Sequence, residues 1–317
     1  MKHIFLNLKR FDIPRAYGGV NSLAAPAEWG GYIVSQTQDE LKAYDGEAEF
    51  AMYFPEAHVA GAAAAKKEDS KVQIGCQSVY REDTAVGGNF GAFTSNRTAN
   101  AMKALGVSSV LIGHCEERKD LMGVLAEAGV SGKAASGAVN RILNQEVRRA
   151  LAAGHSVLYC IGESAEEQPH WQDVLRGQIE LGLAGVMGAA AHQADAAGEG
   201  AEDRVCAEKT ETDRTGAGVQ ASEPAPQICI AYEPVWAIGP GKIPPDRDYI
   251  EKIAAYLKEI THRLPVVYGG GLKTDNAAML ASIPEIDGGL IALTRFAGEI
   301  GFYPDEYLEI IRTYLGH

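Results

Sequence analysis

A carboxylate at a strand end, followed by an apolar loop, is the clearest sign of chemistry in this chain. Glu233 follows the apolar segment Ile228–Ala231, and Pro234 ends that strand because proline cannot donate to a sheet ladder. A short apolar tip, Val235–Ile238, comes next and is closed by Gly239-Pro-Gly241. This order is typical of a general base under a lid that excludes water. A buried glutamate capped by an ordinary loop is the competing interpretation.

Polar side chains at the ends of other strand candidates offer partners for such a base. Asn7 and Lys9 end the first apolar segment and project to the same side under strand alternation, while His114 and Glu116 end another. Together they match proton abstraction next to a carbonyl. Glu233 would take the proton, and His114 would polarise the carbonyl and shuttle a proton. Lys9 and Asn7 would stabilise the enediolate oxygens, with Glu116 accepting a bond from Lys9.

Each of these residues also has a purely structural interpretation. His114 could be a satisfied core histidine, Lys9 a solvated charge at a rim, and Glu116 a cap of the next helix. Singly, such interpretations are the more common outcome. Four polar residues at the ends of three strands favour chemistry, because unrelated accidents would have to meet on one face.

Strand candidates alternate with helical patterns along the whole chain. The strands are predicted at Ile4–Leu8, Glu49–Phe54, Val72–Val79, Ser109–His114, Val157–Gly162, Ile228–Glu233, Val266–Gly270 and Gly289–Leu293. The helices are predicted at Ala27–Tyr44, Glu56–Lys67, Asn96–Leu105, Val139–Ala153, Gln172–Gly185, Asp246–His262, Thr274–Ala281 and Pro304–Tyr314. Eight βα units indicate an α/β protein with a (β/α)8 barrel, in which the carboxyl ends of all strands share one mouth.

Helix boundaries and two irregular regions complete this organisation. Asp246 and Thr274 stand where N-caps are expected, and Pro304 fits a first helical turn. Lys119–Gly137 predicts an extended or partly helical excursion after the fourth strand. Ala189–Pro226 is poor in large apolar residues and predicts a flexible surface insertion. We therefore expect one barrel domain over 1–317, with an insertion at about 189–226 and an extended connection at about 119–137.

Composition limits the classes of partner and the compartment. The chain has 317 residues, 46% hydrophobic and 22% charged residues, and a net charge of −13, which argues against nucleic acid and anionic membranes. No segment approaches a membrane span, and Met1–Leu6 is too short for a signal peptide and reads as the first strand. Five scattered cysteines without a C-x-x-C pair fit reduced thiols in a cytoplasm and no zinc site. His192 and Cys206 of the insertion are better explained as solvated loop residues than as metal ligands.

Several short motifs occur in the order of a known family. They are Asn7-Leu-Lys9, Cys76-Gln77, Gly91-Ala-Phe-Thr94, Gly113-His-Cys-Glu-Glu-Arg118, Cys160-Ile-Gly-Glu163, Ala231–Lys242, Tyr268-Gly-Gly270 and Asp287-Gly288. On these motifs the chain resembles the triosephosphate isomerase family, in which a glutamate base works with a neutral histidine. The resemblance implies a (β/α)8 TIM barrel that needs no cofactor and no metal. It also implies a lid over Pro234–Lys242 latched by Tyr268, and a homodimer in which the loop with Thr94 enters the partner's active site.

The phosphate-binding end departs from the family pattern. The resemblance implies that backbone amides of Gly239, Gly271, Ala292 and Leu293 hold the substrate. Gly271 replaces a serine, and Ala292-Leu293 falls where the family has a glycine pair that lets an anion approach closely. Phosphate binding could persist in modified form, with Arg295 as a clamp, or the pocket could suit another sugar phosphate. A salt-bridged surface residue is the alternative for Arg295.

Other departures are local. A glutamate and an arginine that pair in the family are absent, and Arg97 with Glu117 could restore a pair of swapped polarity. Pro240 replaces a threonine and should stiffen the tip of the lid. Cys115 stands in place of a serine and is not expected to act as a nucleophile.

The resemblance and the strand-end residues together predict an isomerase. The expected reaction interconverts glyceraldehyde 3-phosphate and dihydroxyacetone phosphate, a step of glycolysis and gluconeogenesis, in the cytoplasm. An isomerase of a longer sugar phosphate, such as a tetrulose phosphate, is one alternative. A barrel retained as a non-catalytic binding module is another.

Overall fold

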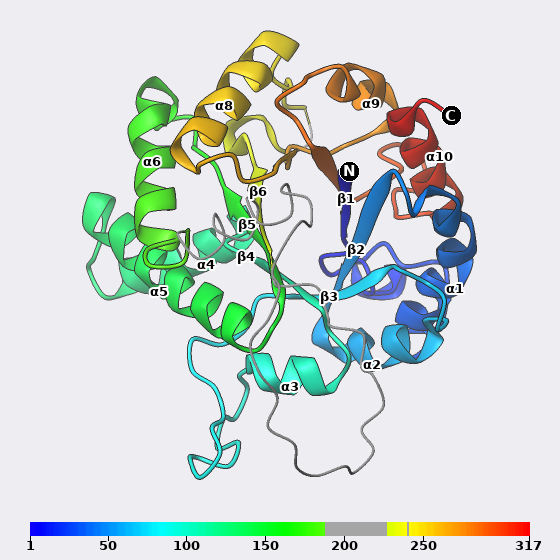
Figure 1. The fold of residues 1–317 in the computed structure, drawn as a ribbon, viewed down its shortest axis with the longest axis horizontal. Helices are drawn as coiled ribbons and strands as arrows, with labels where there is room; N and C mark the ends of the chain where they lie inside the picture. Colours follow the sequence, from blue (N-terminus) through cyan, green and yellow to red (C-terminus); the bar gives the residue numbers. More distant parts are fainter. Residues whose placement is uncertain (188–226, 240) are drawn as a thin grey trace, which may run out of the picture.

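The computed structural model describes residues 1–187, 227–239 and 241–317, and its centre is a closed barrel of eight parallel strands (Figure 1). The strands are β1 Lys2–Asn7, β2 Ala48–Phe54, β3 Gln73–Gln77, β4 Ser109–Ile112, β5 Ser156–Ile161, β6 Ile228–Tyr232, β7 Val266–Tyr268 and β8 Gly288–Ile291. Each pairs with its neighbours in the sequence, and β1 pairs with β8 to close the ring. The predicted (β/α)8 barrel is confirmed.

Helices surround the barrel as an outer layer (Figure 1). They are α1 Trp29–Leu41, α2 Glu56–Ala65, α3 Ala99–Ala104, α4 Cys115–Glu127, α5 Gly132–Ala152, α6 Trp171–Gly182, α8 Arg247–Ile260, α9 Thr274–Ala281 and α10 Pro304–Leu315. In α8 the buried residues Ile250, Ile253, Ala254 and Leu257 recur at helical spacing and face the strands. Full burial of a leucine or isoleucine contributes about 1.5–3 kcal/mol, so this stripe fixes the helix on the barrel.

Helix boundaries agree with the sequence in part. The Asp246 carboxylate accepts the Tyr249 amide and caps α8, and Pro304 opens α10, both as predicted. Thr274 is the first residue of α9, and its N-cap is Lys273. The excursion expected at Lys119–Gly137 is almost entirely helical, because α4 runs on to Glu127 and α5 already begins at Gly132.

Alternating residues of the strands fill the inside of the barrel. Phe5 of β1, Tyr53 of β2, Leu111 of β4 and Leu158 of β5 belong to this inner cluster, which is separate from the core between strands and helices. On β6 the inward residues are Cys229 and Ala231, so the next inward position is Glu233. Strand alternation therefore places Glu233 at the carboxyl end of the barrel, pointing inward.

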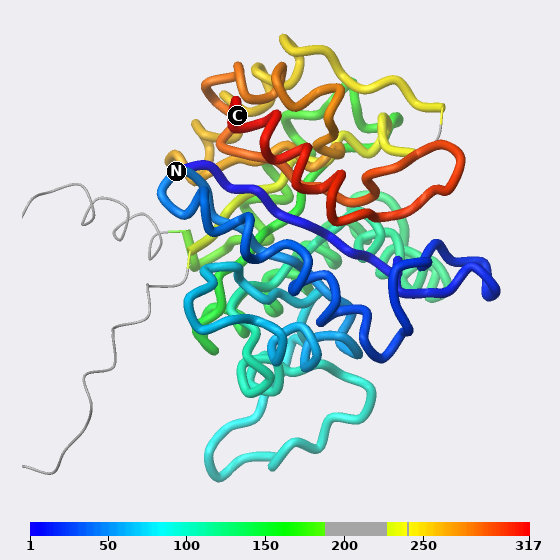
Figure 2. The backbone as a smooth tube through the Cα atoms, turned by 90° about the vertical axis from the view of Figure 1, so that its right-hand side faces the viewer, coloured from blue at the N-terminus to red at the C-terminus, as the bar shows by residue number. Residues whose placement is uncertain are grey.

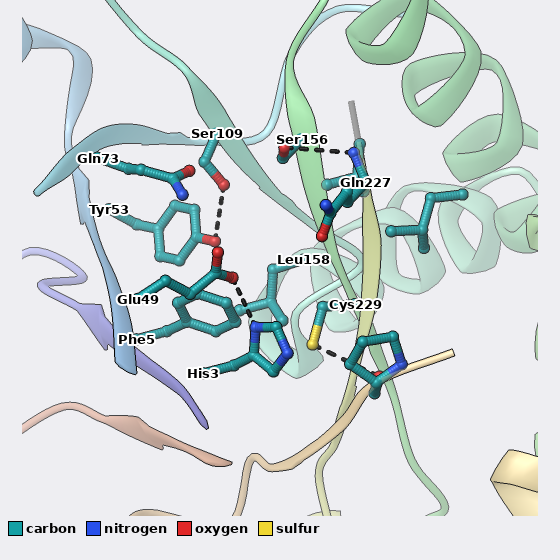
Figure 3. A pocket seen from close by; sticks show the side chains of 13 residues that line it. His3, Phe5, Glu49, Tyr53, Gln73, Ser109, Ser156, Leu158, Gln227 and Cys229 are labelled. Atoms are coloured by element: carbon teal, nitrogen blue, oxygen red, sulfur yellow. Dashed lines mark hydrogen bonds and ion pairs between the residues drawn. The ribbon is translucent and has the colours of Figure 1, made fainter. Parts of the chain in front are cut away.

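The opposite end of the barrel holds a cavity of about 100 Å³ (Figure 3). It is lined by residues at the beginnings of strands, among them His3, Gln73, Ser109 and Ser156. His3 Nδ1 lies 2.6 Å from Glu49 Oε1, and the Tyr53 and Ser109 hydroxyls are 2.9 Å apart. The four side chains form two pairs at the amino ends of the strands. Residues at this end of such barrels usually contribute to stability and not to catalysis.

Loops after the strands gather at one end of the molecule. Figure 2 shows the segment after β6 (yellow) and the segment after β8 (orange-red) at the end opposite the N-terminus. The long loop 78–98, between β3 and α3, projects from the side of the barrel in both views (Figures 1 and 2). The insertion expected at 189–226 lies outside the described residues, as does Pro240. None of the helices in the described part of the chain is both long and apolar enough to cross a membrane.

Candidate active site

The four polar residues predicted at strand ends meet at the carboxyl mouth of the barrel. Asn7 ends β1, Lys9 follows it, His114 follows β4, and Glu233 follows β6. A chain of contacts through Glu116 joins Lys9, His114 and Glu233. Lys9 Nζ lies 2.9 Å from Glu116 Oε1, His114 Nδ1 lies 3.6 Å from Glu116 Oε2, and His114 Nε2 lies 3.0 Å from Glu233 Oε1.

Glu233 is buried with one oxygen held and the other left open. Its side chain is 2% exposed. Oε2 accepts the backbone N–H of Cys115 at 2.9 Å. Oε1 has no hydrogen-bond partner among the described residues, because His114 Nε2 is close but not aligned for a hydrogen bond. A buried carboxylate oxygen without a partner is costly, and it is the atom ready to accept a proton.

Two glycines next to neighbouring strands make room for Glu233, one for its backbone and one for its side chain. A Cβ on Gly162, after β5, would come within 1.8 Å of the Glu233 carbonyl oxygen. A Cβ on Gly269, after β7, would come within 2.8 Å of Glu233 Cγ. Both glycines occupy the inward level next to Glu233 in the barrel. Both glycines belong to motifs noted in the sequence. Only the packing of the three strands shows that a side chain at either position would collide with Glu233.

His114 is held as a hydrogen-bond donor toward the mouth. It is the N-cap of α4, and its Nδ1 accepts the backbone N–H of Glu116 at 3.3 Å. Because a backbone N–H can only donate, Nδ1 carries no proton. A neutral His114 ring therefore carries its proton on Nε2, which faces Glu233.

Lys9 and Asn7 are positioned by Gln77, a residue to which the sequence assigned no role. Gln77 Nε2 lies 3.0 Å from the Lys9 carbonyl oxygen and 3.3 Å from Asn7 Oδ1. The Lys9 amide donates to the same Asn7 oxygen at 3.1 Å, and Lys9 adopts a φ of 39°. The Gln77 and Lys9 donors both use the Asn7 oxygen, and among the described residues Asn7 Nδ2 donates no hydrogen bond. Lys9 does not continue the strand, as alternation had suggested, but turns off it in a left-handed conformation.

Glu116 pairs with Lys9, as predicted. Burial opposes its ionisation, but the charge and hydrogen bond of Lys9 outweigh burial, so the pKa of Glu116 lies below its ordinary value. The predicted helix-capping role is filled by the His114 side chain instead. Glu116 is 62% exposed, which fits a residue that holds Lys9 without closing the site.

The segment after β6, where the sequence predicts a lid, is anchored at its beginning by a buried carboxylate. Glu163 Oε1 accepts the Trp236 indole N–H at 2.8 Å and the hydroxyls of Tyr232 and Tyr249 at 2.9 and 3.1 Å. Trp236 also packs edge-on against Tyr249. The other Glu163 oxygen is buried without a partner in the described residues. Glu163 was noted in the sequence only as part of a motif, and the structure shows it holding the segment behind Pro234.

At the predicted phosphate end two backbone amides are open, and Arg295 is engaged with other side chains. Gly271 has a φ of 99°, and within the described ranges the amides of Gly271 and Leu293 donate no hydrogen bond. Ala292 and Leu293 follow β8 and Gly239 follows β6, so all three stand after the carboxyl ends of parallel strands. Arg295 does not match a clamp: its Nε donates to Glu306 Oε1 at 2.8 Å, and its guanidinium stacks 3.9 Å above the Tyr303 ring. The alternative of a salt-bridged Arg295 is the one the structure supports.

The family model for triosephosphate isomerase matches residues 31–312 of the chain. The chain belongs to the triosephosphate isomerase family. The triosephosphate isomerase of Rhizobium etli is 33% identical over 215 residues, which cover 66% of this chain and 74% of that protein. The enzyme of Pelodictyon phaeoclathratiforme is 28% identical over 256 residues, covering 77% of this chain and 76% of the relative. A crystal structure of triosephosphate isomerase from Bartonella henselae shares the fold with a TM-score of 0.63 at 21% identity, covering 99% of this chain and 98% of that one.

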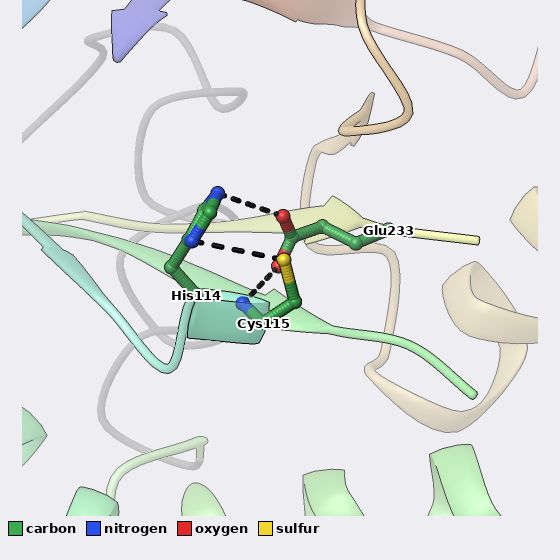
Figure 4. Close-up of side chains that lie close together, drawn as sticks. All are labelled: His114, Cys115 and Glu233. Atoms are coloured by element: carbon green, nitrogen blue, oxygen red, sulfur yellow. Dashed lines mark hydrogen bonds and ion pairs between the residues drawn. The ribbon is translucent and has the colours of Figure 1, made fainter. Parts of the chain in front are cut away.

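Cys115 departs from the serine expected for the family at this position, and it contacts His114 and Glu233 (Figure 4). Its Sγ lies 3.8 Å from His114 Nδ1, and its backbone amide holds Glu233. Burial, together with the negative charge of Glu233, raises the pKa of the Cys115 thiol. A thiol that stays protonated is a poor nucleophile, in line with the prediction.

The swapped pair of Arg97 and Glu117 is not formed. Glu117 Oε2 instead accepts the Gly113 amide at 2.6 Å, and Arg97 Nε is buried without a partner among the described residues. The hypothesis is wrong because Glu117 faces Glu146 of α5. Burial and the charge of Glu117 raise the pKa of Glu146 to about 9, and Ser78 Oγ donates to Glu146 Oε2 at 2.9 Å. Glu146 therefore keeps its proton at neutral pH beside the Gly113-His114 turn.

We expect Glu146→Gln to stabilise the protein, and increasingly so as pH rises. The pKa of Glu146 is raised in the fold, so between about pH 4.5 and 9 the folded chain binds one more proton than the unfolded chain, and its stability falls with pH. Glutamine does not ionise in either state. The substitution therefore removes a decrease in the free energy of unfolding of up to about 1.4 kcal/mol per pH unit. Urea unfolding at about pH 6 and about pH 8 measures the difference. Glu180→Gln, at an exposed position of α6, is the control. Equal pH dependence of stability in Glu146→Gln and wild type would contradict the raised pKa.

Proposed function

We propose that Glu233, His114, Lys9 and Asn7 carry the reaction of this chain, the interconversion of glyceraldehyde 3-phosphate and dihydroxyacetone phosphate. Membership of the triosephosphate isomerase family supports the reaction. The observation that supports the roles is the buried, unpartnered Glu233 Oε1 facing the protonated nitrogen of His114.

In this mechanism the base and the acid act on neighbouring atoms of the substrate. Glu233 Oε1 removes a proton from the carbon next to the carbonyl, and the electrons of that C–H bond form a C=C bond. His114 Nε2–H donates to the carbonyl oxygen as negative charge develops on it. His114 gives its proton to that oxygen and takes the proton of the neighbouring hydroxyl, which becomes the new carbonyl. Protonated Glu233 returns its proton to the former carbonyl carbon, which completes the isomerisation with all atoms and electrons accounted for.

Lys9 and Asn7 stabilise the charged intermediate. The Lys9 ammonium lies at the mouth and is kept in place by Glu116. The Asn7 oxygen accepts two hydrogen bonds, and its N–H groups have no acceptor in the described part of the chain. Fixed donors aimed at developing charge need no reorganisation during the reaction. They also supply local positive potential for an anionic substrate in a chain with a net charge of −13.

Steady-state kinetics of the purified chain test this function directly. We expect kcat/KM for the triose phosphates within roughly 10⁴–10⁸ M⁻¹s⁻¹. A higher value for a four-carbon ketose phosphate would instead identify an isomerase of longer sugar phosphates. No turnover of any aldose or ketose phosphate, by a folded protein, would favour a binding module.

For the phosphate group we propose backbone amides of Gly239, Gly271, Ala292 and Leu293 as the main contacts. The open amides of Gly271 and Leu293 support this, and anions commonly bind such amides. Because Arg295 is engaged with Glu306 and Tyr303, we expect Arg295→Ala to leave the affinity for a phosphoglycolate-type inhibitor within about twofold, well below the tenfold change that 1.4 kcal/mol represents. Isothermal titration measures the inhibitor affinity of wild type, Arg295→Ala and Glu306→Ala, the variant that removes the partner of Arg295. A tenfold loss in Arg295→Ala alone would restore the clamp.

We also propose a homodimer in a cytoplasmic setting. The loop 78–98 projects from the barrel and exposes Val86 and Phe90, together with the segment that holds Thr94. Exposed apolar side chains on a projecting loop are typical of a contact surface. The four described cysteines are free, as expected for a reducing compartment. Sedimentation analysis of the full chain and of Phe90→Asp tests the dimer, and a monomeric wild type would contradict it.

A further inference from the structure

The backbone that leads into His114 is held from both sides of Gly113. The Gly113 amide donates to Glu117 Oε2 at 2.6 Å, and the Gly113 carbonyl oxygen accepts Arg118 Nε at 2.8 Å. Gly113 has a φ of 79°, and a Cβ there would come within 2.9 Å of the Cys160 carbonyl oxygen. This turn therefore has little freedom, and the side chains of Glu117 and Arg118 set its position.

A second carboxyl group adjoins Glu117. Glu146 of α5 is only 7% exposed, shares a hydrogen bond with Glu117, and accepts the Ser78 hydroxyl on Oε2 at 2.9 Å. Two carboxylates at hydrogen-bond distance and away from water do not both stay ionised, so the pair keeps one proton. The Gly113 amide favours an ionised Glu117, because an N–H can only donate. The proton therefore belongs to Glu146, which donates it to Glu117.

The other groups that face Glu146 do not reverse this assignment. The Ser78 hydroxyl and the charge of Arg81, from the loop 78–98, both favour an ionised Glu146. Burial and the negative charge of Glu117 act more strongly in the opposite direction, and they raise the pKa of Glu146 to about 9. At neutral pH, Glu146 is therefore the donor in a chain of hydrogen bonds that ends at the Gly113 amide.

We propose that Glu146 is a positioning residue for the reaction, which keeps His114 in place by donating a hydrogen bond to Glu117. His114 follows Gly113 directly, and its Nε2 lies 3.0 Å from Glu233 Oε1, so a shift of the turn misaligns the proposed acid and base. When Glu146 loses its proton to solvent, the hydrogen bond is lost and two carboxylates repel each other. Glu117 then releases the Gly113 amide. The hydrogen bonds belong to the fold, and only their effect on turnover rests on the proposed function.

The pH dependence of kcat tests this role. One pH unit above a pKa of about 9, only about a tenth of Glu146 keeps its proton, so wild type should lose kcat about tenfold between about pH 7 and 10. Glu146→Gln should retain at least about half of its kcat over that range, because glutamine donates to Glu117 but does not ionise. Glu180→Gln, at an exposed position of α6, should follow wild type. Circular dichroism at each pH checks that the chains stay folded. Equal alkaline losses in wild type and Glu146→Gln would overturn the proposal.

Substitutions of Glu117 provide an arm that does not depend on pH. Glu117→Leu removes the acceptor of the Gly113 amide. We expect kcat to fall at least roughly tenfold with little change in KM, since a displacement of about 1 Å can cost roughly 10²-fold. Glu117→Gln keeps an oxygen for this amide and should recover most of the loss. Wild-type kcat in Glu117→Leu would contradict the positioning of His114 through this turn.

The ring nitrogens of His114 report on its position without reference to activity. Isotope-labelled histidine is incorporated into the full chain, and the His114 resonances are identified by their absence from His114→Asn. They should shift as the pH passes through about 9 in wild type and stay in place in Glu146→Gln. Such a shift in a chain without isomerase activity would leave the positioning standing and contradict the proposed function. Identical His114 resonances in the two proteins at every pH would overturn the inference.

Discussion

Glu233→Gln is expected to lower kcat by roughly 10²–10⁴-fold, the usual contribution of a general base. Glutamine has nearly the same volume, and its oxygen can still accept the Cys115 amide that now holds Oε2. The oxygen at the other position is replaced by an amide nitrogen that cannot take a proton. We expect little change in KM, because the substitution removes a group that acts in the transition state.

A matched control separates chemistry from the loss of a buried charge. Glu285, just before β8 at the opposite end of the barrel, also has a buried oxygen without a partner in the described residues. Glu285→Gln should retain wild-type kcat. Steady-state rates in both directions, with thermal unfolding of each variant, provide the comparison. A Glu233→Gln enzyme within tenfold of wild type would exclude Glu233 as the base.

His114→Asn is expected to lower kcat by a similar factor, roughly 10²–10⁴-fold, while α4 stays capped. The Asn oxygen can take the place of Nδ1 and accept the Glu116 amide, and asparagine is among the preferred N-caps. Its side chain is too short to reach the position of Nε2. The variant therefore removes the donor at the mouth and leaves the helix start intact.

His114→Gln serves as the partial rescue. Its amide nitrogen lies near the position of Nε2, so it can donate a hydrogen bond to the carbonyl but cannot exchange a proton with it. Activity should lie between that of His114→Asn and wild type. Unfolding temperatures and kcat are measured for all three proteins. Equal activity of His114→Asn and wild type would show that the histidine only caps the helix.

Most of the barrel could be predicted from sequence, because strand and helix periods are local. The strands β6, β4 and β1 were located correctly, although each ends one or two residues before its predicted end, and the residues at their ends are the proposed acid, base and stabilising groups. The connection at Lys119–Gly137 was harder to predict. Its helicity depends on His114 capping α4 and on α5 packing against α4 and α6, which are non-local conditions. Gln77 and Glu163 were also missed as functional supports, since their partners lie on other strands.

The sequence by itself determined which residue types stand at the strand ends, and so the kind of reaction and the family. Only the tertiary structure decided how their atoms are used. It gives one Glu233 oxygen to the Cys115 amide and leaves the other open, engages Arg295 with Glu306, and turns Glu117 toward Glu146 instead of Arg97. The physical reason is that residue type and periodicity are local properties, whereas hydrogen-bond partners and burial depend on segments that are distant in the chain and meet only when the barrel closes.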